Sequence, residues 1–161
     1  MSELIEKTIR DSFPDAVLET TDLFGILNIK ITPASLLAVC GMLHSNPEMG
    51  FDYLADITAI DWSAIPSSVP PSQGGKTDRI EVVYQLTNLA KNVKVALRVD
   101  LDREKPELDS VTSIWKGADY QEREVFDLMG VVFNGHPDLR RILLPEDWDG
   151  YPLRKDYVIP D

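Results

Sequence analysis

The densest group of side chains that could carry chemistry lies in the stretch "DYQEREVFDLMG". Glu124 and Asp127 are three residues apart and His136 follows, so the three could form a metal site or an acid–base pair of a hydrolase. On a helix, Asp119, Arg123 and Asp127 recur every four residues, so both carboxylates could instead pair with the one guanidinium. The same charges could also meet complementary charges on a neighbouring protein. The spacing alone leaves these three interpretations open.

The amino-acid composition and net charge exclude several classes of function. The chain has 161 residues, 43% of them hydrophobic, and this length and composition predict one domain with an ordinary core. Its formal net charge is -11. This charge argues against nucleic acid as a partner, because such affinity depends on Lys and Arg. The single cysteine, Cys40, excludes an intrachain disulfide and cannot supply the four thiolates of an iron–sulfur cluster. Without a bilayer-length apolar run or a signal peptide, we expect membrane contact only through partners.

The helices and strands that position these side chains can be predicted from the spacing of apolar residues and from helix-capping residues. Apolar residues every three or four positions predict helices at 2–12, 32–45 and 119–129. Thr32 and Pro33 are suited to the start of the second helix, and Gly130 to the end of the last. Other apolar and turn-rich segments predict strands at 16–20, 25–31, 51–62, 79–88 and 93–101, a helical turn at 111–115 and a surface loop at 63–76.

The order of these elements is αββαβββα, and alternating βαβ units are absent. It predicts an α+β fold in which a mainly antiparallel, mixed sheet is flanked by helices, followed by a long extended Pro-rich C-terminal tail. No Gly-rich phosphate loop follows a strand, so the sequence indicates no nucleotide site.

The tail fits neither a long helix nor a central strand. It carries large apolar side chains such as Trp148, but prolines recur through it and remove backbone donors. Such a segment gains free energy by lying on a preformed surface. Arg140, Arg141 and Arg154 are suited to carboxylates at an interface with a partner. We predict a single domain with an α+β core at 1–133 and an interaction tail at 134–161. Packing of the tail on its own core alone is the alternative.

The same stretch resembles a known family. The blocks "QEREVFDLMG", "GHPDLRRIL" and "PLRKDY" are similar to the signature of the C subunit, or 30-kilodalton subunit, of proton-translocating NADH:quinone oxidoreductase, respiratory complex I. The C-terminal part is also similar to the J subunit of the cyanobacterial and plastid complex. Carried over residue by residue, the resemblance implies recognition and folding roles for Glu122, Arg123, Glu124, Asp127, Gly130, Gly135, His136, Pro137, Leu139, Arg140, Arg141, Trp148, Pro152, Arg154, Lys155 and Asp156.

The resemblance implies a non-catalytic structural and assembly subunit of the peripheral arm, on the cytoplasmic side of the membrane. It implies packing against the quinone-site subunit, which is related to nickel-iron hydrogenase large subunits, and proximity to cluster-bearing subunits. This chain would hold no cofactor, metal or active site, and flavin and iron–sulfur clusters would belong to the partners. The alternatives are a subunit of a related F420H2-, ferredoxin- or hydrogen-dependent membrane complex, or a freestanding metal-dependent hydrolase.

Overall fold

The computed structural model describes residues 2–63 and 78–159. The loop predicted at 63–76 lies outside the described residues, apart from Ser63. In chain order the elements are α1 (Ser2–Ser12), β1 (Val17–Leu23), β2 (Ile26–Ile31), the 3-10 helix η1 (Pro33–Ser35), α2 (Leu36–Ser45), β3 (Tyr53–Asp61), β4 (Arg79–Asn88), β5 (Val93–Asp102), β6 (Glu107–Asp109), α3 (Ala118–Met129) and β7 (Val132–Asn134). The predicted α+β fold is confirmed.

The main sheet has five strands in the order β1-β2-β5-β4-β3. Strands β3, β4 and β5 form an antiparallel meander, and β1 and β2 form a hairpin. Strands β2 and β5 pair in parallel, and α2, β3 and β4 form the long connection that such a pair needs. The sheet is therefore mixed but mainly antiparallel, as the element order indicates.

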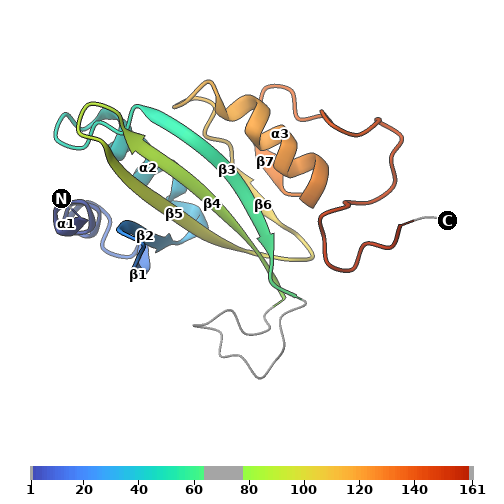
Figure 1. Cartoon of the computed structure of the whole chain (residues 1–161), viewed down its shortest axis with the longest axis horizontal. Coiled ribbons are helices and arrows are strands. Elements are labelled where there is room, and N and C mark those ends of the chain that lie inside the picture. Colours follow the sequence, from blue (N-terminus) through green and yellow to red (C-terminus); the bar gives the residue numbers. More distant parts are fainter. Residues whose placement is uncertain (1, 64–77, 160–161) are drawn as a thin grey trace.

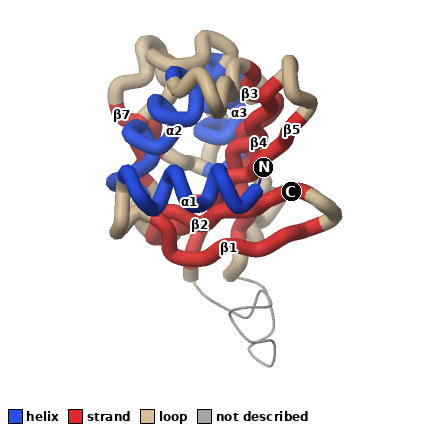
Figure 2. Tube along the Cα trace, turned by 90° about the vertical axis from the view of Figure 1, so that its left-hand side faces the viewer, coloured by secondary structure: helices blue, strands red, loops and turns tan. Residues whose placement is uncertain are grey.

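The helices cover one face of this sheet and enclose the core. Helix α1 contributes Ile5 and Ile9, and α2 contributes Leu36, Cys40 and Leu43, all of them fully or almost fully buried. Figure 1 shows α1 beside β1 and β2, while α3 lies beyond β3 and the tail extends on the far side of α3. The view in Figure 2 shows α1 and α2 stacked against the same side of the molecule. The tail therefore occupies the end of the molecule opposite α1.

Two local features differ from the prediction. The helix expected from Thr32 begins as a 3-10 turn, and regular α-helix starts only at Leu36. The Thr32 hydroxyl lies 2.7 Å from the Ser35 hydroxyl, so these side chains bond each other instead of the backbone donors. Strands β6 and β7, which were not predicted, form a two-stranded parallel sheet of three residues each. Strands of three residues are too short to show a period.

Gly130 ends α3 with a φ of +73°, the left-handed conformation expected of a C-terminal glycine. A Cβ atom at this position would lie 2.6 Å from the ring of Tyr151, so the missing side chain also makes room for the tail.

We expect Gly130→Ala to lower the free energy of unfolding by about 1–3 kcal/mol, because it adds left-handed strain and displaces Tyr151. Urea denaturation measures the change. Gly41→Ala is the control, since that glycine lies inside α2 and a Cβ atom there would meet nothing within 4 Å beyond its chain neighbours and the backbone of its own helix. It should stabilise the protein by up to about 1 kcal/mol. Equal effects of the two substitutions would contradict the assignment.

Candidate functional site

The buried carboxylate of Asp127, on α3, fixes the course of the tail. Its Oδ2 accepts hydrogen bonds from three consecutive tail amides, those of Ile142, Leu143 and Leu144, at 2.7–3.0 Å. Its Oδ1 accepts a bond of 2.7 Å from the guanidinium of Arg141. Burial by itself would raise the pKa of Asp127, but the Arg141 and backbone donors outweigh it and hold the pKa below its ordinary value. The carboxylate is therefore ionised and fully bonded.

The tail also caps the C-terminal end of α3. The last carbonyls of a helix have no partner within it, and α3 has no basic residue in its last turn. The tail supplies the donors: Arg141 Nη1 to the carbonyl of Asp127, Leu153 N to Leu128, and Arg154 Nε to Met129. Two guanidinium groups thereby lie at the negative end of the helix dipole, where positive charge is stabilising.

Arg141 and Arg154 meet on one aromatic ring. The guanidinium carbon of Arg141 lies 5.3 Å from the centroid of the Tyr151 ring, and that of Arg154 lies 5.1 Å from it. Arg141 Nη2 donates in addition to the carbonyls of Trp148 and Gly150. Arg141 therefore connects three parts of the chain: α3, its own segment and the turn that follows Trp148.

A second ionic anchor holds the end of the tail against the sheet. Asp61, at the end of β3, accepts a hydrogen bond from the backbone N–H of Lys155 at 2.9 Å and pairs with Arg103. Arg103 also pairs with Asp156 at 2.7 Å. Burial opposes ionisation of Asp61, but the bonds from Arg103, Lys155 and Ser63 hold its pKa well below its ordinary value. No motif in the sequence indicated Asp61 or Arg103, because both are far from the tail along the chain.

The start of the tail is held by His136. Its ring is buried: Nδ1 accepts from the backbone N–H of Asp138, so Nε2 carries the proton and donates to the carbonyl of Asp119 at 3.1 Å. The fully buried Glu122 lies beside it, with Oε2 4.0 Å from Nε2. Burial raises the pKa of Glu122, although bonds from Ser110 and Val111 oppose the rise.

The predicted pairing of Arg123 with Asp119 and Asp127 is wrong. Arg123 donates instead to the carbonyls of Arg140 and Arg141 at 3.1 Å, while Asp127 pairs with Arg141. Asp127 already accepts four hydrogen bonds, from three tail amides and the Arg141 guanidinium. The physical reason is that the Pro-interrupted tail leaves carbonyls without donors, and Arg123 supplies two.

The predicted metal or acid–base set is not brought together. Asp127 is held by the tail, His136 faces Asp119 and Glu122, and Glu124 is exposed. Within the described ranges, no group of three or more His, Cys, Asp or Glu side chains could hold a metal ion. The freestanding hydrolase therefore has no geometric support.

The other predicted residues lie along the tail. Gly135 turns the chain with a φ of +82°, Pro137 is exposed, and Leu139 packs partly buried against the core. Arg140 forms an exposed pair with Asp138 at 2.8 Å, and Pro152 is half-buried.

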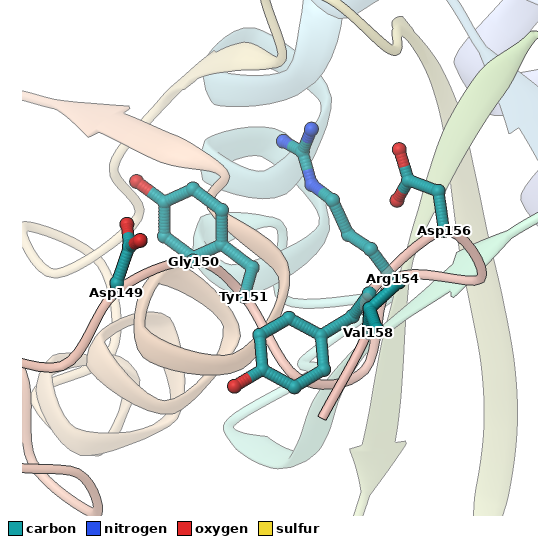
Figure 3. Close-up of a pocket in the computed structure, with 7 residues that line it drawn as sticks. Asp149, Gly150, Tyr151, Arg154, Asp156 and Val158 are labelled. Atoms are coloured by element: carbon teal, nitrogen blue, oxygen red, sulfur yellow. The ribbon is translucent and has the colours of Figure 1, made fainter. Parts of the chain in front are cut away.

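Several large apolar side chains of the docked tail remain exposed: Leu143 at 59%, Trp148 at 38% and Leu153 at 57%. An open pocket of about 440 Å³ lies in the same segment, and Figure 3 shows Asp149 and Asp156 at its opposite ends with Tyr151 and Arg154 between them. Arg141, Arg154 and several backbone amides of the tail thus bond to its own domain, whereas these apolar side chains are exposed. Such exposure is typical of a protein-interaction surface.

Comparisons with known proteins agree on one family. The family model described as "Respiratory-chain NADH dehydrogenase, 30 Kd subunit" matches residues 29–161. The C subunit of the NADH-quinone oxidoreductase of Roseiflexus sp. (strain RS-1) is 38% identical over 92% of this chain and 79% of its own length. The protein of the same name from Moorella thermoacetica is 41% identical, over 90% of this chain and 87% of its own.

Solved structures show the same fold. A structure described as a trypsin-resistant fragment of Nqo5 has a TM-score of 0.68 and 32% identity, and the match covers 86% of this chain and 100% of that one. A membrane-bound sulfane sulfur reductase, described as an archaeal respiratory membrane complex, has a TM-score of 0.73 at 24% identity, over 98% of this chain and 85% of that one. Among the described helices of this chain, none is both long and apolar enough to cross a bilayer.

We expect Asp127→Asn to release the tail from α3, because an amide replaces the charge that three N–H groups and Arg141 bind. A loss of about 2 kcal/mol in charge-assisted bonding should raise the undocked fraction about thirtyfold. Trypsin cleavage after Arg141 should accelerate by a similar factor, since cleavage follows the open population. Glu124→Gln is the control: it removes one exposed charge from the same helix and should leave the cleavage rate unchanged.

The pH dependence of this effect follows from the lowered pKa of Asp127. A carboxyl with a depressed folded-state pKa contributes stability that is complete above the unfolded value of about 3.9 and is lost as pH falls through the folded value. The difference between wild type and Asp127→Asn should therefore be constant from neutral to mildly acidic pH. It should shrink only in stronger acid.

Proposed function

The chain belongs to the family of the 30-kilodalton subunit of respiratory-chain NADH dehydrogenase, and from this premise we propose that it is a non-catalytic structural and assembly subunit. Its complex is an NADH-quinone oxidoreductase, and its binding surface is the docked tail together with α3. The partner is the quinone-site subunit of the peripheral arm, on the cytoplasmic side of the membrane. Redox cofactors belong to the partner subunits.

One observation carries the proposal: the tail is held by polar contacts on its inner side and leaves Leu143, Trp148 and Leu153 exposed. Asp127 and Asp61 bind tail amides, so the backbone needs no partner to satisfy these donors. The apolar side chains gain nothing from this arrangement unless another surface covers them. A preformed surface of this kind supports docking to a neighbour, and the buried, fully bonded carboxylates support a structural role for the charged residues.

The proposal that this chain holds no redox cofactor can be tested by chemical analysis of the purified protein. We expect the purified chain to contain no flavin, iron–sulfur cluster or stoichiometric metal, because it has one cysteine, Cys40, which is buried, and two histidines. Elemental analysis and an absorption spectrum measure this directly. Iron or zinc at one equivalent, or a flavin spectrum, would contradict the proposal.

Docking is tested by shortening the chain after Asp138, which keeps β7 and the contacts of His136. We expect the shortened protein to unfold cooperatively in urea but to lose co-purification with the quinone-site subunit of the same complex. Losing two interface anchors worth about 2 kcal/mol each would weaken binding about a thousandfold. The Nqo5 structure, described as a trypsin-resistant fragment, supports a protease-stable core in this fold.

Point variants keep this test informative if the shortened chain unfolds. Trp148→Ala removes an aromatic side chain that is 38% exposed and keeps the backbone carbonyl that accepts from Arg141. Leu89→Ala, between β4 and β5, is the control for loss of an exposed apolar side chain. Retained co-purification by both the shortened chain and Trp148→Ala would show that the tail is not the docking surface.

A further inference from the structure

We propose that the partner presents an apolar centre surrounded by lysine or arginine side chains to the exposed tail surface. This surface is defined by Leu143, Glu146, Asp147, Trp148, Asp149 and Leu153. The inference rests on the proposed function and deepens it, since it states the chemistry of the surface that the tail binds.

The basic residues of the tail are mostly used within the chain. Arg141 binds Asp127, and Arg154 donates to the carbonyl of Met129 and stacks on Tyr151. Arg140 is paired with its neighbour in sequence, Asp138. Arg141 and Arg154 are therefore committed to the tail's own structure, whereas Arg140 stays exposed beside Asp138.

The acidic residues next to Trp148 in the sequence do not pair with basic side chains of the tail. Glu146, Asp147 and Asp149 are exposed, and in the part of the chain that the structure describes none of them forms an ion pair within 4.0 Å. Lys155 is also exposed in the tail, so the four side chains together keep a net negative charge. The tail thus carries exposed acids on both sides of the exposed Trp148 in the sequence.

The two parts of this surface have different effects on binding. Burial of Trp148, Leu143 and Leu153 provides affinity, because apolar area removed from water is the main favourable term in association. The acids determine which surface is accepted, since a like charge opposite them is repelled and an opposite charge accelerates encounter. The pocket beside Asp149, with Tyr151 at its wall, adds a recess next to the acids (Figure 3). Charge complementarity therefore selects a basic rim.

The test measures binding of the full chain to the quinone-site subunit of the same complex at low and at high salt. In the triple variant Glu146→Lys, Asp147→Lys and Asp149→Lys, we expect affinity at low salt to fall at least tenfold. The wild type should bind more weakly as salt rises, because screening weakens attraction between exposed charges. The variant should lose or invert this dependence.

The matched control is Asp11→Lys, Asp15→Lys and Glu19→Lys. These acids are exposed on α1, the following turn and β1, at the end of the molecule opposite the tail (Figure 1), and their reversal changes the net charge equally. Affinity within twofold of wild type is expected for this control. Equal or tighter binding by the tail variant would overturn the inference while leaving the proposed function intact. A wild-type chain that does not bind this subunit would overturn the proposed function, and the inference with it.

Discussion

The arrangement of the tail depends on one buried carboxylate. Asp127 has no exposed surface, and burying an unpaired charge is costly, so the carboxylate is stable only when all its partners are in place. Those partners are Arg141 and three consecutive amides, which the course of the tail presents together. A Pro-interrupted segment that cannot bond to itself therefore acquires one defined course. The same requirement makes the end of α3 and the tail a single unit.

The tail in turn completes the helix that holds it. Gly130 bonds the carbonyl of Phe126, and tail donors reach the next three carbonyls, so the last turn of α3 is fully satisfied. Helices usually receive these donors from water or from residues just beyond their end. Here Arg141 and Arg154 arrive from 14 and 25 residues further along the chain. Helix and tail therefore stabilise each other.

The sequence predicted what depends on local periodicity. The helices, the five strands of the main sheet and the left-handed Gly130 follow from patterns within about ten residues, and each is found within a few positions of its prediction. Strands β6 and β7 were missed because three residues show no period. The bond between Lys155 and Asp61 joins positions 94 residues apart, and no spacing rule connects them.

The charged residues also show that sequence spacing does not predict contacts between distant segments. A spacing of four on a helix correctly indicates that Asp127 and Arg123 can approach each other, but the choice between partners depends on what else competes for the carboxylate. Arg141 and the tail amides bind Asp127 in place of Arg123, because they approach the carboxylate from outside the helix and bury it. A tail fixed in this way loses less conformational entropy when a neighbour binds than a free tail would. Its arginines thereby contribute to binding indirectly, by holding the exposed apolar and acidic side chains in place before the partner arrives.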